Sequence, residues 1–181
     1  MKKISFPAVL STAVLMFLFW MVITGQIVSI FRGEASWQVL TAGGIVSILV
    51  GLFASRFFIH ESAFYLWNPA RFLPFLFYCF IIFPIELIKA NVDVARRALS
   101  PKLPVNPGIV KIPTDLKSEY GQSMLANSIT LTPGTITMDI AEEEGQTNMY
   151  IHWIDVATEE PVEAGNAIKG TLEKWIGRIW K

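Results

Sequence analysis

The sequence predicts a membrane protein in which three N-terminal transmembrane helices precede a small α+β domain of β-α-β-β-α order. Three observations predict this fold class. Of the 181 residues, 52% are hydrophobic, and these concentrate in the first half of the chain. That half holds three apolar segments long enough to cross a bilayer, for which roughly 20 residues suffice. The second half shows short periodic segments instead, so we expect a membrane domain over 1–100 and a soluble domain over 101–181.

The first two apolar segments run from about residue 4 to 31 and from about residue 39 to 58. Lys2 and Lys3 could begin a signal peptide. However, the apolar run is long and no clear small-residue cleavage site follows it, so we expect a retained span. The second segment carries small residues at spacings of three and four, which favours close helix packing in lipid, although glycine is common in membrane helices generally. These residues are Gly43, Gly44, Ser47 and Gly51.

The third segment covers residues 72–99, crossing the membrane to about residue 88 and continuing as a juxtamembrane helix. Pro74 lies in its first turn, where proline is tolerated, whereas Pro84 lies deeper and should kink the helix or remove a hydrogen bond. Glu86 stands three residues before Lys89, which is a helix-neighbour spacing. Two interpretations stay open: a charge ladder on a juxtamembrane helix, or a contact between Glu86 and an ion-conducting partner.

Charge and cysteine content exclude several classes of function. Lysine plus arginine equals aspartate plus glutamate at 15 each, so nothing indicates nucleic-acid binding. A single cysteine, Cys79, excludes an intrachain disulfide and a cysteine-based metal site. The first two spans have no ionisable residue in their central parts, unlike an ion path. With three spans, the lysines and arginines divide almost evenly between the two sides, leaving a narrow preference for a cytoplasmic C-terminal domain.

Prolines at 101 and 104 end the third helix and open the soluble half. Residues 108–113 suit a short strand, and Thr114 or Asp115 could cap a helix over about 116–130. Thr132-Pro133-Gly134-Thr135 suits a type II turn. After it, Ile136, Met138 and Ile140 alternate with polar residues, which is typical of a half-buried strand with its apolar side inward.

A polar loop over 142–148 should lead to a second strand over 149–156 and complete a hairpin. Pro161 should open a single last helix with one apolar face, for which core packing and membrane contact are both possible. The residues of that face are Ile168, Leu172, Trp175, Ile176 and Ile179.

The soluble half shows no catalytic or cofactor-binding motif. We find no Gly-rich phosphate loop, no nucleophile elbow and no His-Glu-x-x-His sequence. The three adjacent glutamates at 142–144 are typical of a solvated run, and His152 is expected to be structural. We therefore expect no catalytic residue, no cofactor, no metal and no enzyme activity.

Several short segments follow one another in a distinctive order. They are Glu86-Leu87-Ile88-Lys89-Ala90-Asn91, Leu99-Ser100-Pro101-Lys102-Leu103, Pro107-Gly108-Ile109, Pro113-Thr114-Asp115-Leu116-Lys117-Ser118, the turn from Ser128 to Thr135, and Tyr150-Ile151-His152. Taken together, over about residues 65–156, they resemble the E subunit of the multisubunit Mrp-type (Mnh/Sha) cation/proton antiporters.

The resemblance implies an accessory, non-catalytic subunit of the cell membrane with a cytoplasmic C-terminal domain. Its partners would be other membrane subunits of a sodium/proton antiporter, or of the similar module in membrane-bound hydrogenases and related respiratory complexes, together with the lipid bilayer. A free-standing membrane-anchored binding module is the other class kept open. The candidate interface or structural residues are Glu86, Lys89, Asn91, Ser128, Thr130, Thr132, Pro133, Gly134 and Thr135. We expect the turn at 132–135 to dock the soluble domain on its own helices or on a neighbouring subunit.

Overall fold

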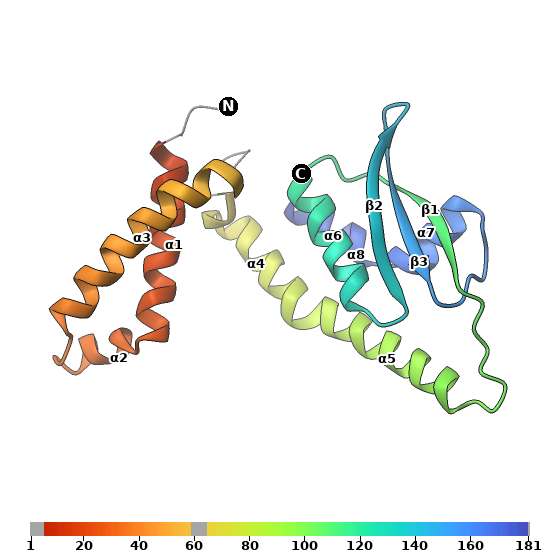
Figure 1. Ribbon diagram of the computed structural model, residues 1–181, viewed down its shortest axis with the longest axis horizontal. Helices are drawn as coiled ribbons and strands as arrows, with labels where there is room; N and C mark the ends of the chain where they lie inside the picture. The colour runs from red at the N-terminus through yellow and green to blue at the C-terminus, as the bar shows by residue number, and fades with distance from the viewer. Residues whose placement is uncertain (1–5, 59–64, 181) are drawn as a thin grey trace. The chain divides into compact units, whose positions relative to one another are not determined.

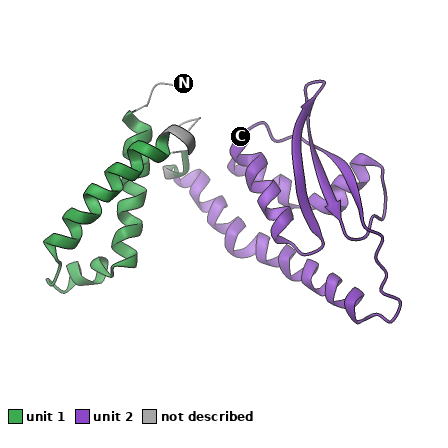
Figure 2. Ribbon diagram, in the orientation of Figure 1, with its two compact units in different colours: residues 1–68 green, residues 69–181 purple. Residues whose placement is uncertain are grey.

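The computed structural model describes residues 6–58 and 65–180 (Figure 1). It divides into two compact units, Met1–Asn68 and Pro69–Lys181 (Figure 2), and each is described by itself. Three helical stretches are long and apolar enough to cross a membrane: Phe6–Ile23, Trp37–Ser55 and Pro69–Leu99. The predicted order, three apolar helices followed by a small sheet-and-helix domain, is confirmed. The polarity of the sequence predicts a domain boundary after residue 100. In the structure the third apolar helix belongs to the same compact unit as the small domain, and that unit begins at Pro69.

The first unit is built from α1 (Phe6–Ile23), α2 (Gln26–Phe31) and α3 (Trp37–Phe58), with a 3₁₀ turn, η1, at Tyr65–Trp67. A single helix over residues 4–31 is wrong. The chain breaks at Gly25, where φ is 68°, a value that L side chains rarely adopt and that ends a right-handed helix. Residues 4 and 5 lie outside the described range.

The small residues of α3 lie against α1, as the packing interpretation expects. A Cβ atom at Gly51 would lie 2.9 Å from the carbonyl oxygen of Val9, and one at Gly43 would lie 2.5 Å from Nε1 of Trp20. That indole nitrogen donates a hydrogen bond to the carbonyl of Val39 at 3.1 Å. Gly44 has nothing within 4 Å of such an atom and is not part of the contact.

The second unit begins with one long helix made of α4 (Pro69–Phe77), the π-helical turn η2 (Tyr78–Ile82) and α5 (Phe83–Leu99). Pro84 lies in the first turn of α5, directly after η2. A proline removes a backbone donor, and a π turn changes the hydrogen-bond spacing locally without ending the helix. The sequence predicts a kink or a lost hydrogen bond at Pro84. In the structure a π turn lies just before it, and the helix continues to Leu99.

The α/β domain is a three-stranded antiparallel sheet with helices on one face (Figure 1). Strands β1 (Gly108–Thr114), β2 (Thr135–Glu143) and β3 (Gln146–Trp153) lie in the order β1-β3-β2. Helices α6 (Glu119–Leu131), α7 (Pro161–Lys169) and α8 (Leu172–Ile179) complete it. The fully buried side chains of the core come from both layers: Ile112, Met149 and Ile151 from strands, and Leu125, Ile129, Ile176 and Ile179 from helices.

The hairpin and the helix boundaries differ from their predictions. β2 continues to Glu143 and β3 begins at Gln146, so a two-residue turn replaces the predicted loop over 142–148. Its residues Glu144 and Gly145 both have positive φ, 53° and 79°, as a type I′ hairpin turn requires. Helix α6 begins at Glu119 with Ser118 as its N-cap residue rather than with Thr114 or Asp115. The single last helix is wrong as well, because Gly170, with φ 48°, separates α7 from α8.

The predicted orientation of β2 is inverted in its first half. Ile136 and Met138 are 49% and 59% exposed, and Thr137 faces α6 instead, where its hydroxyl donates to the carbonyl of Ala126 at 3.1 Å. A β-bulge between Thr137 and Asp139 then shifts the register. An extra residue in one strand reverses which side chains point inward. Alternation alone predicts two faces but not which of them the helices cover.

Candidate functional site

Six of the nine predicted site residues line one groove in the second unit. The groove, with a volume of about 280 Å³, lies between α5, the turn after α6, and helices α7 and α8. We call it the α5 groove. Its lining includes the predicted residues Glu86, Lys89, Thr132, Pro133, Gly134 and Thr135, together with Ala90, Asp93, Arg97, Trp153, Ile154, Ala167, Ile168 and Leu172.

The turn at 132–135 lies against α5 and the end of β3, and glycine is required at its third position. Gly134 has φ 95°, as the third residue of a type II turn does. Its carbonyl accepts a hydrogen bond of 2.8 Å from the backbone N–H of Ile154. A Cβ atom there would lie 3.0 Å from Cγ2 of Ile154 and 3.4 Å from Cγ2 of Val94 on α5. Backbone conformation and close approach therefore both favour glycine.

Threonine hydroxyls attach this turn to the end of α6. The hydroxyls of Thr132 and Thr135 both donate to the carbonyl of Ile129, each at 2.7 Å. The last carbonyls of a helix lack intrahelical partners, and these two side chains supply one. Thr130 accepts a hydrogen bond of 3.1 Å from the backbone N–H of Thr137. The threonines of the predicted set thus join α6 to the start of β2.

Glu86 has partners within its own chain. Its Oε1 atom lies 2.9 Å from Nζ of Lys89 and accepts a hydrogen bond of 3.2 Å from the hydroxyl of Thr171. The side chain of Glu86 is 23% exposed and that of Lys89 is 64% exposed. These contacts fit the charge-ladder interpretation, because a half-exposed pair of this spacing contributes only a few tenths of a kcal/mol. Asn91 lies outside the groove and donates to the carbonyl of Leu87 at 2.8 Å.

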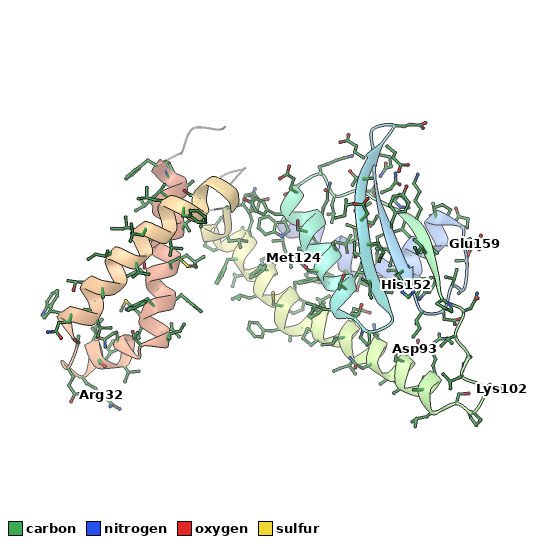
Figure 3. The ribbon with its side chains drawn as sticks, in the orientation of Figure 1. Arg32, Asp93, Lys102, Met124, His152 and Glu159 are labelled. Carbon is green, nitrogen blue, oxygen red and sulfur yellow. The ribbon has the colours of Figure 1, made fainter. Side chains whose placement is uncertain are left out.

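Arg97 forms one end of the contact between α5 and the domain, four residues after Asp93, which Figure 3 labels on α5. Its Nε donates to Asp93 at 2.7 Å and its Nη1 to the carbonyl of Pro104 at 3.0 Å. Nη1 also pairs with Asp155, which lies 58 residues away in the sequence. The helical spacing of Asp93 and Arg97 is visible in the sequence, but nothing there indicates the partner at 155.

Tyr78 forms the upper polar contact, and sequence reasoning missed it. Its hydroxyl lies 2.6 Å from Oγ of Ser128, and Tyr78 itself is 2% exposed. The Ser128 hydroxyl also lies 2.7 Å from the carbonyl of Met124, to which it can donate. Directly before Tyr78, the ring of Phe77 lies 5.0 Å from that of Trp175 on α8. A tyrosine inside an apolar segment was the available signal, because a buried phenol needs a hydrogen-bond partner.

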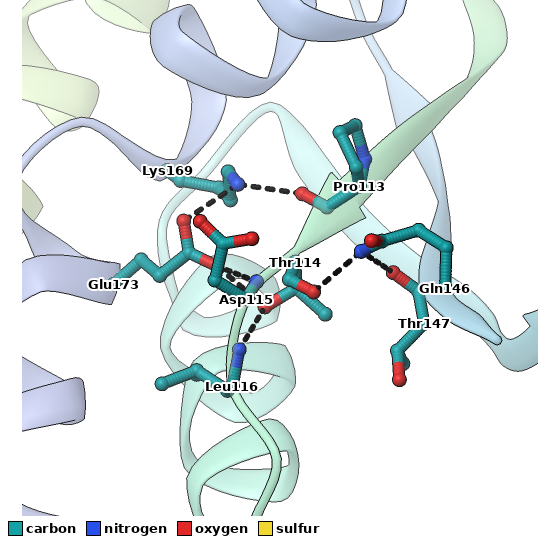
Figure 4. A network of polar contacts seen from close by, with 8 residues as sticks. All are labelled: Pro113, Thr114, Asp115, Leu116, Gln146, Thr147, Lys169 and Glu173. Atoms are coloured by element: carbon teal, nitrogen blue, oxygen red, sulfur yellow. Dashed lines mark hydrogen bonds and ion pairs between the residues drawn. The ribbon is translucent and has the colours of Figure 1, made fainter.

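A second polar network joins β1 to α7 and α8 (Figure 4). Lys169 and Glu173 form an ion pair of 2.6 Å with side chains only 11% and 17% exposed. Lys169 also donates to the carbonyl of Pro113 at 2.6 Å, while Glu173 accepts from the Thr114 hydroxyl at 2.5 Å and from the backbone N–H of Asp115 at 3.0 Å. Both charges are paired and hydrogen-bonded, which suits a structural role.

A third cluster lies on the open face of the sheet. Lys111 pairs with Glu143, and the hydroxyl of Tyr150 donates to the same carboxylate at 2.5 Å. The Lys111 hydrogen bond, followed by that of Tyr150, holds the pKa of Glu143 below its ordinary value. The same contact raises the pKa of Lys111, and the hydrogen bond to Glu143 raises the pKa of Tyr150. Glu143 is therefore part of a cross-strand cluster, and its side chain is 40% exposed, in keeping with the expected solvated run.

Within residues 6–58 and 65–180, no group of three or more histidine, cysteine, aspartate or glutamate side chains could hold a metal ion. The charged side chains described above on α5, in the network around Lys169 and in the cluster around Lys111 are paired within the chain. Their chemistry is that of packing and recognition, since none combines a nucleophile, a base and an oxyanion site.

Comparison with known proteins gives one consistent family. A family model described as Na+/H+ ion antiporter subunit matches residues 13–179. The Na(+)/H(+) antiporter E subunit of Bacillus subtilis (strain 168) is 39% identical over 137 residues, covering 76% of this chain and 80% of that protein. The corresponding E1 subunit of Staphylococcus saprophyticus is 43% identical over 100 residues. That alignment covers 55% of this chain and 60% of the relative, less than two thirds of its length.

One solved structure covers nearly the whole chain. It belongs to the membrane-bound sulfane sulfur reductase, described as an archaeal respiratory membrane complex. The similarity has a TM-score of 0.78 and 37% sequence identity, over 96% of this chain and 99% of the other.

Proposed function

The chain belongs to the family of Na+/H+ antiporter E subunits, and from that premise we propose that it is an accessory, non-catalytic membrane subunit of a multisubunit cation/proton antiporter. In this role it supports assembly of the complex, while partner subunits move the ions. We place it in the cell membrane, with its α/β domain in the cytoplasm. Its partners would be the other membrane subunits and the lipid around them.

The observation that carries the proposal is the distribution of charge. The sequence of α1 contains no ionisable side chain, and that of α3 contains only Arg56, close to its end. A path for ions through a bilayer needs such groups facing the bundle interior. Glu86, the acidic residue of the third apolar helix nearest its middle, is bound to Lys89 and Thr171. Ion translocation is therefore better assigned to other chains.

A second setting is favoured by the similarity to the archaeal respiratory complex. Here the same type of subunit would belong to the antiporter-like module of a respiratory or hydrogenase complex. The role of the chain would be unchanged, but its complex would also contain redox subunits. The two settings differ in composition and not in the chemistry of this chain.

The test is purification of the tagged chain from native membranes in mild detergent, followed by mass spectrometry of the intact complex. Large multispan antiporter subunits should co-purify. Additional metal-binding redox subunits would assign the respiratory setting, and their absence would assign the simple exchanger. Recovery of the chain as a solitary, monodisperse monomer would refute both settings and favour a free-standing binding module. If the chain is an assembly subunit, deletion of its gene should lower both the yield of the complex and its Na+-dependent proton exchange.

A further inference from the structure

The helix α4–η2–α5 meets the length and apolarity of a membrane span, yet the α/β domain contacts it at several points, where Tyr78 is buried. Contacts extend at least from Phe77, whose ring lies 5.0 Å from that of Trp175, to Arg97, which pairs with Asp155. These roughly 20 residues extend about 30 Å at 1.5 Å per residue. The hydrocarbon core of a bilayer is about as thick. If this helix crossed the membrane, the attached domain would share its depth.

The domain surface is unsuited to hydrocarbon. β1 and β2 are the two edge strands of an open three-stranded sheet, and open sheet edges facing lipid do not occur at membrane depth, because their backbone groups have no partner there. Lys111 and Glu143 form an ion pair on the sheet with side chains 42% and 40% exposed. Such groups are excluded from lipid unless they face a protein interior or water.

The helix also carries exposed apolar side chains, which we call the stripe. Its members Leu73, Phe80 and Ile88 recur at spacings of seven and eight, close to two turns each, which places them near one face of the helix. Leu73 is 64% exposed, Phe80 72% and Ile88 63%. Lys89, whose side chain is 64% exposed, follows the last of these. An apolar face flanked by basic residues is the pattern of a helix that lies in the membrane interface.

The distribution of lysine and arginine along the chain points the same way. If α1 and α3 are the spans, only Arg32 lies in the connection between them, and all the other basic residues near the membrane fall on one side. These are Lys2, Lys3, Arg56, Arg71, Lys89, Arg96, Arg97 and Lys102. The positive-inside rule then gives a strong bias. With a third span through this helix, the same residues divide almost evenly.

We propose that the helix α4–η2–α5 lies along the cytoplasmic surface of the membrane, with the stripe that contains Leu73, Phe80 and Ile88 seated on lipid and the α/β domain on its water-facing side. The spans of the chain are then α1 and α3. The N-terminus and the α/β domain lie on the same side, which is the cytoplasm. This inference does not rest on the proposed function, because it concerns how the chain meets the bilayer.

The test uses single cysteines in the full chain within its native complex, on a Cys79→Ser background. Asn68→Cys and Lys102→Cys lie just before and just after the helix, and Glu34→Cys lies between α2 and α3. A membrane-impermeant maleimide is applied to right-side-out and inverted vesicles. We expect the cysteines at 68 and 102 to react from the cytoplasmic side and the cysteine at 34 from the outside. Reaction of the cysteines at 68 and 102 from opposite sides would overturn the proposal.

A second experiment measures how deep the stripe lies in the membrane and whether lipid covers it. Spin labels at positions 73, 80 and 88 of the complex, in vesicles of phosphatidylethanolamine and phosphatidylglycerol, report collisions with oxygen. A surface helix places all three at a similar depth. A spanning helix separates the first and last by about 22 Å, with a maximum of oxygen access at its middle. A flat profile with high oxygen access supports lipid as the occupant. A peaked profile, or low access at all three positions because another protein covers them, would overturn it.

Discussion

Replacing Gly134 with alanine tests whether the turn packs closely against the end of β3. Two costs add at this position. A residue with a Cβ atom at φ 95° loses about 1–2 kcal/mol. The new atom would also lie 3.0 Å from Cγ2 of Ile154, and overpacking of this kind costs about 1–3 kcal/mol. We therefore expect Gly134→Ala to destabilise the protein by about 2–5 kcal/mol.

Gly145 provides the matched control. It also has positive φ, 79°, but a Cβ atom there meets nothing within 4 Å, so Gly145→Ala should lose only the backbone term of about 1–2 kcal/mol. The assay is thermal unfolding of the full chain in mild detergent, followed by tryptophan fluorescence, where 1 kcal/mol corresponds to about 2–4 °C at this chain length. An equal fall in Tm for both variants would show that close packing of the turn at Gly134 contributes nothing, and the packing argument would fail.

Three further outcomes are expected. Tyr78→Phe should cost about 0.5–1.5 kcal/mol, and a double-mutant cycle with Ser128→Ala in thermal melts should show positive coupling; additive losses would contradict the hydrogen bond. The pKa of Glu143 is lowered in the folded protein. Its contribution to the stability of the fold is therefore present above the ordinary glutamate pKa and is lost as pH falls through the folded pKa. The pKa of Lys111 is raised in the folded protein. Its contribution to stability is therefore present below the ordinary lysine pKa and is lost as pH rises through the folded pKa. Glu143→Gln should flatten both limbs of a Tm-against-pH curve, whereas unchanged limbs would refute the pairing. Glu86→Gln should leave Na+-dependent proton exchange by the assembled complex unchanged in vesicles, and loss of exchange with intact assembly would instead assign this residue to the ion path.

Much of the candidate site could be predicted from local sequence. Thr132-Pro133-Gly134-Thr135 contains its own turn chemistry, and its Gly134 has the positive φ that a type II turn requires. Glu86 and Lys89 pair because helical spacing brings them together. The partners at the other end of each long-range contact could not be predicted. Tyr78 and Ser128 are 50 residues apart, and no periodicity within either helix indicates that they meet.

The side of β2 that points to the core is a second feature that the sequence did not predict. Residues 135–138 alternate between threonine and an apolar side chain, and the hydrophobic effect predicts that the apolar side faces the core. In the fold, this part of β2 runs beside the end of α6, where Thr135 bonds a terminal carbonyl of the helix. The polar side is therefore turned inward, and Ile136 is left on the open face of the sheet. A bulge then restores the inward direction for Ile140, which is paired with the buried Met149.

The sequence by itself determined the three apolar helices, the small α/β domain after them and the absence of charge in the central parts of the first two helices, because composition and periodicity are local properties. Only the tertiary structure decided what the third helix touches. Apolarity and length describe that helix equally well as a span or as a helix lying on a membrane surface. The contacts of the domain with residues 77–97 of the helix are the observation on which our proposal of a surface helix rests, because a charged surface and open strand edges cannot share the depth of a bilayer core.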